Sequence, residues 1–219
     1  MSGGVLSPGT SVALYDISAG VPAVSNWTWF NQGSATATDS SPTGKAIYLV
    51  GQGGTHNTTA LRGLYKAVPS TPYTVTGLLI HNSLSIVSYA QFFMGWTDGT
   101  KVQAIALAGS DALTTPLTIV VQSYSNSTTF NSGQGTNIPT SFLAPVFFQL
   151  TDDGTNVAFK FGTDGVNFVT QYSVAKASGY LGSGGYTNLI WGISDVNAAS
   201  TTALTATLRL WDTGTRSFP

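Results

Sequence analysis

The chain has 219 residues and lacks both cysteine and glutamate, so all nine of its acidic residues are aspartate. Without cysteine it has no disulfide bond, no thiolate metal site and no cysteine nucleophile. Charged residues are scarce, at 8% of the chain, and the formal net charge is −1. Because no basic field can neutralise phosphates, we expect neither nucleic-acid binding nor attachment to an anionic membrane surface. The apolar runs are too short to span a membrane, so no membrane insertion is expected.

Residues that usually fill exposed helix faces are also few, because the chain has no glutamate and only eight lysines and arginines. The chain is instead rich in threonine (31), serine (24) and glycine (25). Threonine favours pleated, half-buried strands, whereas glycine, serine and aspartate favour tight turns. The composition therefore predicts an all-β protein with many short strands and little or no helix.

Short apolar runs separated by turn residues support this prediction. In the last run every second residue from Leu204 to Leu210 is apolar, and the residues between them are polar. Such alternation indicates antiparallel sheets with one buried face. The thirteen candidate strands are Trp27–Phe30, Ala46–Val50, Leu61–Val68, Tyr73–Ile80, Leu84–Ser88, Tyr89–Trp96, Lys101–Leu107, Leu117–Tyr124, Val146–Thr151, Asn156–Phe161, Phe168–Ser173, Leu189–Ser194 and Ala203–Trp211.

The segments between these runs predict turns and loops. Asp-Gly pairs at 98–99, 153–154 and 164–165 each supply the positive-φ residue that a tight hairpin needs. Segments 31–44 and 125–145 are rich in Ser, Thr, Asn, Gly and Pro, and we predict them to be long surface loops. The one plausible short helix is QYSVAKASG at 171–179, with a loop as the alternative.

The domain organisation follows from the uniform character of the strands. Strands on both sides of each long loop are alike, so we predict one sandwich domain over residues 25–219. Residues 1–24, rich in Gly, Pro and Ser with two short apolar patches, are predicted to be an N-terminal arm or attachment segment. Residues 1–10 have no basic region followed by an apolar stretch, so no signal peptide is expected.

Three stretches match a known pattern in order and spacing: FMGWTDGTKVQ at 93–103, FQLTDDGTN at 148–156 and FGTDGVNF at 161–168. With the final Leu210-Trp211-Asp212, they make the part from Gln91 to Trp211 resemble the concanavalin A-like (laminin G-like) domains of tailed-bacteriophage virion proteins. In the third stretch Gly and Phe stand where that family usually has Ser and Trp. The resemblance implies an antiparallel two-sheet β-sandwich, a concanavalin A-like jelly roll, and it implies fold more directly than function.

Residues with catalytic chemistry are few. Of the two histidines, His56 lies in a Gly/Thr/Asn loop and His81 ends an apolar strand, and no Gly-x-Ser-x-Gly elbow accompanies them. A glycosidase needs two carboxylates facing each other across a cleft. Turn capping explains at least four of the nine aspartates, which are Asp98, Asp152, Asp153 and Asp164. We therefore predict no catalytic residue and no enzymatic activity.

A calcium site is the best metal candidate, because Asp152, Asp153, Thr155 and Asn156 supply closely spaced oxygens. Turn capping by the two aspartates explains the same residues more simply. Zinc has no plausible ligand set. We therefore predict no metal site and no cofactor.

Carbohydrate binding uses aromatic rings that stack on sugars, beside Asn, Asp and backbone groups. Trp191 lies within an apolar run and Trp211 ends an alternating strand, so both are predicted to be core residues. Trp96, beside an Asp-Gly turn, and Trp27 and Trp29, beside the Ser/Thr-rich loop, are the surface candidates, although core packing is the commoner role of tryptophan. The ligand-binding residues stay unassigned.

The resemblance predicts a non-enzymatic bacteriophage surface protein located on the virion, as a capsid decoration, head fibre, tail fibre or spike component. It would act in particle assembly or host attachment, with other copies of itself and neighbouring virion proteins as partners and a host cell-surface glycan as a further ligand. Homo-oligomerisation is expected from the low charge and the apolar patches at 5–15. The alternative function is a carbohydrate-binding receptor-recognition module, and a polysaccharide-degrading enzyme ranks below it.

Overall fold

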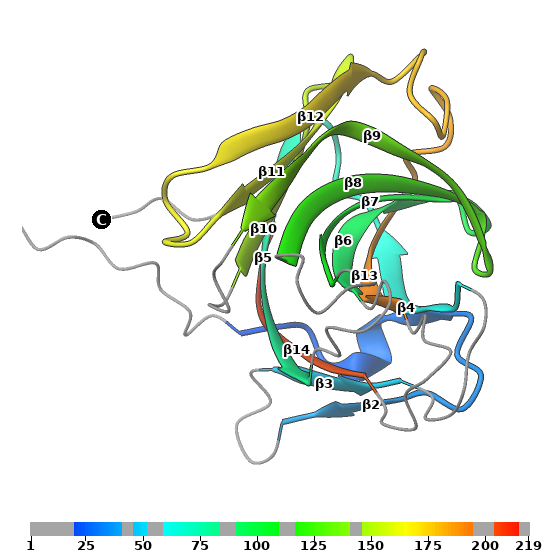
Figure 1. The fold of residues 1–219 in the computed structure, drawn as a ribbon, viewed down its shortest axis with the longest axis vertical. Helices are drawn as coiled ribbons and strands as arrows, with labels where there is room; N and C mark the ends of the chain where they lie inside the picture. Colours follow the sequence, from blue (N-terminus) through cyan, green and yellow to red (C-terminus); the bar gives the residue numbers. More distant parts are fainter. Residues whose placement is uncertain are drawn as a thin grey trace, which may run out of the picture.

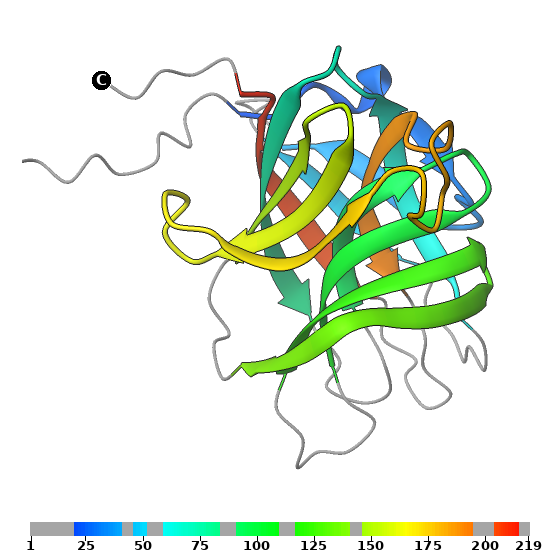
Figure 2. The same ribbon diagram turned by 90° about the horizontal axis from the view of Figure 1, so that it is seen from above.

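The computed structural model of the chain describes residues 20–40, 46–51, 59–83, 91–109, 117–140, 146–194 and 204–214. These residues form two seven-stranded antiparallel sheets that face each other as separate layers (Figures 1 and 2). The first sheet has the order β1-β4-β13-β6-β7-β8-β9, and the second has the order β12-β11-β10-β5-β14-β3-β2. The predicted antiparallel two-sheet sandwich of the jelly-roll type is confirmed.

Strands that follow one another in the chain belong in some cases to the same sheet and in others to different sheets. The first sheet consists of β1 (Thr28–Phe30), β4 (Leu61–Ala67), β13 (Asn188–Ser194), β6 (Gln91–Thr97), β7 (Val102–Ala108), β8 (Leu117–Asn126) and β9 (Thr129–Thr140). The second consists of β12 (Val169–Ala175), β11 (Asn156–Gly162), β10 (Val146–Asp152), β5 (Tyr73–Ser83), β14 (Thr205–Asp212), β3 (Ile47–Val50) and β2 (Thr36–Asp39). The one helix among the described residues is the 3-10 turn η2 (Val24–Asn26).

Two predicted loops contain strands, so those predictions are wrong. β2 lies within 31–44, and β9 occupies most of 125–145. Both are edge strands with mostly exposed side chains, so neither needs the apolar alternation that marks the other strands. Segment 171–179, considered as a short helix or a loop, contains no helix: β12 continues to Ala175, and turns follow. The candidate strand Leu84–Ser88 lies outside the described residues.

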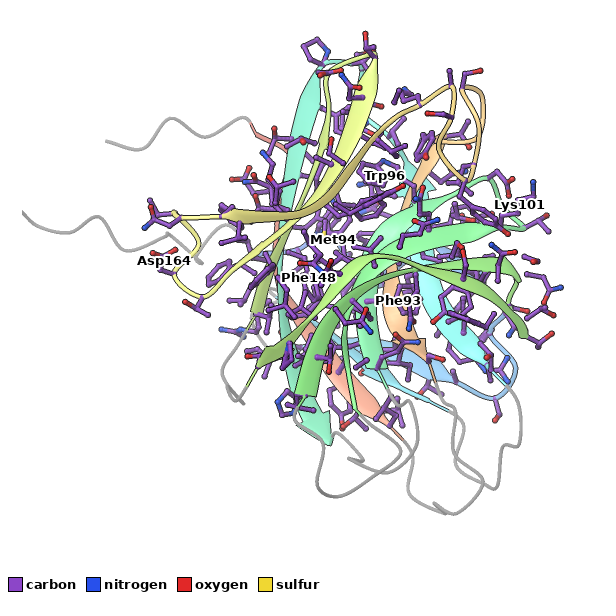
Figure 3. The ribbon with its side chains drawn as sticks, turned by 45° about the horizontal axis from the view of Figure 1, so that its top comes forward. Phe93, Met94, Trp96, Lys101, Phe148 and Asp164 are labelled. Carbon is purple, nitrogen blue, oxygen red and sulfur yellow. The ribbon has the colours of Figure 1, made fainter. Side chains whose placement is uncertain are left out.

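The three Asp-Gly pairs do form hairpin turns, as predicted, with positive φ at Gly99, Gly154 and Gly165. At the third turn, which Figure 3 marks at the tip of the β11–β12 hairpin, Asp164 accepts three hydrogen bonds. They come from the Asn167 side chain (2.7 Å) and from the backbone N–H groups of Asn167 (2.8 Å) and Val166 (2.9 Å). These bonds lower the pKa of Asp164 to about 2. Asp164 therefore stabilises this turn by accepting hydrogen bonds from its backbone and side chain.

Alternating residues of the central strands divide the apolar side chains between two clusters. In β6, Phe92, Met94 and Trp96 face the second sheet and belong to the main core, which they share with Phe148 (Figure 3). Phe93, between them, points to the opposite side of the first sheet. There it belongs to a second buried cluster, here called the free-face cluster: Phe30, Leu61, Phe93, Val102, Ala104, Ala106, Ala108, Val120, Tyr124 and Ile190. Both faces of β6 and β7 are therefore buried.

The first sheet is strongly curled, and its strands β9, β8, β7 and β6 appear as nested arcs in Figure 1. Glycines inside the strands permit this close approach. A Cβ on Gly95 would lie 2.2 Å from the Gln103 carbonyl oxygen, and one on Gly192 would lie 2.1 Å from the Arg62 carbonyl oxygen. No real Cβ fits at either distance, so glycine is required at both positions. The curl brings opposite corners of the first sheet together.

The N-terminal segment is described from Gly20 onward. The Gly20 carbonyl accepts a hydrogen bond from the Trp211 backbone N–H (3.2 Å), and the Pro22 carbonyl accepts one from Trp27 Nε1 (3.1 Å). The Val24 backbone N–H donates to Asp39 Oδ1 at 2.9 Å. Residues 20–24 therefore pack on the sandwich. The predicted arm as a whole, and the boundary at residue 24, stay predictions because residues 1–19 lie outside the described part.

Candidate functional site

A hollow of about 270 Å³ opens where two corners of the first sheet meet. It lies at the edge of the free-face cluster, since it shares Phe30 with that cluster and Tyr65 packs against it. Residues of β1, β4 and the β6–β7 and β8–β9 turns line this corner hollow, namely Trp29, Phe30, Asn31, Tyr65, Gly99, Thr100, Asn126 and Ser127. Residues distant in sequence therefore form one small concave surface.

A backbone hydrogen bond closes the corner. The Leu61 N–H, at the start of β4, donates to the Ser127 carbonyl oxygen in the β8–β9 turn at 2.8 Å. On the other side of the same residue, the Leu61 carbonyl accepts a hydrogen bond from Asn31 Nδ2 at 2.9 Å. Leu61 thus ties together the β1 end and the β8–β9 turn, which form two walls of the hollow.

Asn31 has the only positive φ (54°) of any non-glycine residue in the described ranges. Asparagine adopts the left-handed conformation more readily than most residues, yet it still costs free energy, and such residues cluster at functional sites. Here the conformation is held from both ends of the residue, because the side chain donates to Leu61 and the Asn31 carbonyl accepts from Arg62 Nη1 at 2.8 Å. The chain therefore fixes Asn31 in a strained geometry at the wall of the hollow.

The two turns that form the remaining walls are held by their own side chains. Asp98 Oδ1 accepts from the N–H groups of Thr100 (2.8 Å) and Lys101 (2.7 Å). Asn126 Oδ1 accepts from the N–H and hydroxyl of Thr128, at 2.8 and 3.0 Å. Both turns are therefore fixed before any ligand arrives.

The lining of the corner hollow has no charged residue and has several polar atoms that are available to a ligand. In the described part of the chain, the Tyr65 hydroxyl, Asn31 Oδ1 and Asn126 Nδ2 make no hydrogen bond, and neither do the hydroxyls of Thr100 and Ser127. The Tyr65 ring, half-buried against the free-face cluster, adds an apolar surface. The hollow can therefore offer neutral donors, neutral acceptors and an aromatic ring to a ligand.

A second hollow, of about 440 Å³, lies at one end of the second sheet. Its lining is mainly prolines and hydroxyl residues from the ends of β5, β10 and β14: Pro69, Ser70, Pro72, Tyr73, Thr74, Thr151, Asp152, Asp153, Thr213 and Gly214. Its two aspartates are engaged within the protein. Asp152, almost fully buried, pairs with Lys176 Nζ at 2.7 Å. Asp153 accepts from the backbone N–H groups of Asn156 and Thr155, which lower its pKa.

The same hydrogen bonds show how the residues of the candidate calcium site are used in the structure. Lys176 and the Gly154 N–H occupy the two oxygens of Asp152, and the three hydrogen bonds of Asp153 come from Thr155 and Asn156. The four residues thus form a capped turn. Among the described residues, no group of three or more His, Cys, Asp or Glu side chains is placed to hold a metal ion.

The two histidines lie away from both hollows as far as they are described. His81 is half-buried and stacks on Phe92, with ring centroids 5.8 Å apart. His56 is outside the described residues. None of the described helices is long and apolar enough to cross a membrane.

The tryptophans are mostly core residues. Trp191 and Trp211 are buried, as predicted. Trp96 is fully buried and donates to the Tyr73 hydroxyl at 2.8 Å, and Trp27 is buried edge-on against Trp211, so neither reaches the surface. Trp29 is half-buried and is the only tryptophan that lines the corner hollow, although its side chain packs toward the main core. Sequence reasoning missed Tyr65, Asn31 and Asn126.

No family model matches the chain, and no curated protein matches it in sequence. Solved structures do match the fold. A functionally unknown protein from Saccharomyces cerevisiae aligns with a TM-score of 0.59 and 10% identity, over 90% of this chain and 98% of that one. An alginate lyase from Klebsiella pneumoniae aligns with a TM-score of 0.52 and 10% identity, over 83% and 84% of the two chains.

The GH43 protein BlXynB from Bacillus licheniformis aligns with a TM-score of 0.54 and 12% identity, over 87% of this chain but 37% of that one. This chain therefore spans about a third of the length of that protein. Identities this low show a shared fold alone. The chain has the concanavalin-like jelly-roll sandwich, and the comparisons do not support a phage virion origin.

Two predictions from the sequence are thereby contradicted: that the chain is a non-enzymatic phage surface protein, and that it is not an enzyme. The first relied on the resemblance to phage proteins, and the second relied on the small number of residues with catalytic chemistry. Structural neighbours with this sandwich include a GH43 protein and an alginate lyase, so the fold itself gives no ground for a non-enzymatic assignment. The predicted virion location, self-association and virion partners stay untested predictions.

Proposed function

We propose that the protein binds a neutral carbohydrate in the corner hollow. One observation carries the proposal: an aromatic residue, Tyr65, lies in a small uncharged hollow beside amide and hydroxyl groups that have no partner in the described chain. Sugars present apolar C–H faces, which pack on aromatic rings, and hydroxyls, which both donate and accept hydrogen bonds. The lining contains matching groups of each kind.

The absence of charge in the lining favours neutral sugars over acidic ones. None of the lining residues is a lysine, an arginine or an acid. A uronate or sulfate would lose its hydration without gaining an ion pair, which is unfavourable. The volume of about 270 Å³ is slightly below that of pockets that enclose drug-sized ligands, so the hollow suits one sugar unit of a longer chain. The carbohydrate-active proteins among the structural neighbours support a carbohydrate as the ligand, and the uncharged lining is what favours a neutral one.

Affinity electrophoresis against immobilised glucan, xylan and mannan tests the proposal, with alginate as the anionic comparison. We expect retardation by at least one neutral polysaccharide and none by alginate. Replacing Tyr65 by alanine should abolish the retardation, whereas Tyr48→Phe, a change at another half-buried tyrosine in β3 of the second sheet, should leave it unchanged. Lack of retardation by all three neutral polysaccharides would refute the proposal.

Asn126 allows a sharper variant. In Asn126→Asp, Oδ1 is retained as the acceptor that fixes the turn, while the Nδ2 donor is replaced by a charged oxygen. We expect this variant to fold normally and to lose binding. Measuring new reducing ends after incubation with the retained polysaccharide then shows whether binding is accompanied by cleavage.

A further inference from the structure

Phe130 is a large apolar side chain exposed next to the corner hollow. It is 49% exposed and is the second residue of β9, directly after Thr129, which pairs with the hollow-lining Asn126. Its ring packs edge-to-face on Tyr124, with centroids 5.8 Å apart and an interplanar angle of 77°. An isolated exposed apolar residue is ordinary. This one differs because it is aromatic, supported from below and adjacent to a proposed sugar site.

The support under Phe130 is fixed. Tyr124 is buried, its hydroxyl donates to Gln122 Oε1 at 2.6 Å, and the same hydroxyl accepts a hydrogen bond from Gln91 Nε2. The hairpin that carries both rings is itself tied to β4 through the bond from Leu61 to Ser127. The Phe130 ring is therefore held in a defined place relative to the hollow and loses little conformational freedom when a ligand packs on it.

The surroundings of Phe130 match those of the hollow. No charged residue occurs from Leu117 to Thr140, the whole span of the β8–β9 hairpin. Along the same hairpin, Asn131 Nδ2 donates to the hydroxyls of Ser123 (3.0 Å) and Ser132 (3.2 Å), so the polar groups of the hairpin are amides and hydroxyls. A neutral, hydroxyl-bearing ligand that extends from the hollow along the hairpin would therefore find uncharged amide and hydroxyl groups there as well.

We propose that the carbohydrate is a chain of at least two sugar units, with one unit in the corner hollow and the next on the exposed face of Phe130. This inference rests on the proposed function. It assigns Phe130 as a residue that determines preference for oligosaccharides over monosaccharides. An aromatic contact of this kind contributes about 0.5–1.5 kcal/mol, which corresponds to roughly a twofold to tenfold change in affinity.

Calorimetric titration of the full chain with glucose, xylose and mannose, and with the disaccharide and tetrasaccharide of each series, tests the inference. The wild type should bind the disaccharide and tetrasaccharide of one series roughly twofold to tenfold more tightly than its monosaccharide. In Phe130→Ala this gain should vanish while the monosaccharide affinity is retained. Val169→Ala, which truncates a side chain that is 56% exposed on β12, is the matched control and should behave as the wild type.

The outcomes separate the two proposals. If the wild type binds a monosaccharide as tightly as the longer chains, or if Phe130→Ala keeps the gain, the role of Phe130 is refuted and the hollow stands. If the wild type binds none of the three series, both proposals fall. If Phe130→Ala changes the sedimentation coefficient and leaves oligosaccharide binding intact, Phe130 contacts protein and the inference is overturned.

Discussion

The backbone N–H of Leu61 and the carbonyl oxygen of Ser127 form a 2.8 Å hydrogen bond between β4 and the β8–β9 turn. Three strands, β13, β6 and β7, separate β4 from β8 in the first sheet. The two residues can meet only because the sheet is curled so far that its corners touch. That contact creates the corner hollow, so the curl of the sheet and the proposed binding site have the same origin.

The glycines inside the strands should therefore be essential for stability. A Cβ on Gly95 meets the Gln103 carbonyl oxygen at 2.2 Å, so Gly95→Ala forces β6 and β7 apart. We expect it to lower the free energy of unfolding by about 2 kcal/mol or more. Gly133→Ala is the control, since a Cβ there has open space and Gly133 has no positive φ. It should be neutral or slightly stabilising. Equal urea midpoints for the two variants would contradict the account of the curl.

The strained Asn31 gives a second prediction. Asn31→Gly loses the side-chain hydrogen bond to Leu61, which lowers the free energy of unfolding by about 1 kcal/mol. It also removes the cost of the positive φ, which raises the free energy of unfolding by about 1 kcal/mol, so the two effects should nearly cancel. Asn31→Ala loses the bond and retains the strain. Urea unfolding should therefore find the alanine variant about 1 kcal/mol less stable than the glycine variant. If the alanine variant is as stable as the glycine variant, the strain is absent.

Alkaline pH should destabilise the sandwich. Burial raises the pKa of Tyr186 to about 12 and raises those of Tyr73 and Tyr124 as well. An unfolded tyrosine ionises near pH 10, so above that pH the unfolded chain holds fewer protons than the folded one. Stability should thus be unaffected by these groups below about pH 10 and should fall as the pH rises toward 12.

Urea midpoints at pH 8, 10 and 11, together with tyrosinate absorbance, measure this effect. Tyr186→Phe should show a shallower fall between pH 10 and 11, because one of the three buried hydroxyls is removed. A midpoint that is the same at all three pH values would show that the buried tyrosines ionise as readily in the folded chain as in the unfolded one.

Much of the fold was predictable because the buried strands follow a simple rule. β14 alternates apolar and polar residues from Thr205 to Leu210, and the Asp-Gly pair that follows β10 is a local turn signal. The edge strand β9 was missed because most of its residues are Ser, Thr, Asn, Gln and Gly, the same residues that make loops. Its pairing with β8 is decided by the neighbouring strand and not by its own pattern.

The candidate site was less predictable, because it depends on the curl of a sheet. Tyr65, Asn31 and Asn126 come from three separate places in the chain and meet only when the corners of the first sheet touch. Of the three tryptophans predicted as surface candidates, Trp96 and Trp27 fill the core, and Trp29 lines the hollow. The glycines within the apolar runs of β6 and β13 were the available signal, since a glycine inside a strand often marks close backbone approach.

The central claim is that a neutral sugar chain occupies the corner hollow. The most direct measurement is an amide and aromatic NMR titration of the labelled full chain with the tetrasaccharide of the glucan, xylan or mannan series. The account predicts saturable shifts concentrated at Asn31, Tyr65, Thr100, Asn126 and Phe130, with the second hollow around Thr74 and Thr151 unchanged. Shifts confined to the second hollow, or no shift with any of the three tetrasaccharides, would contradict it.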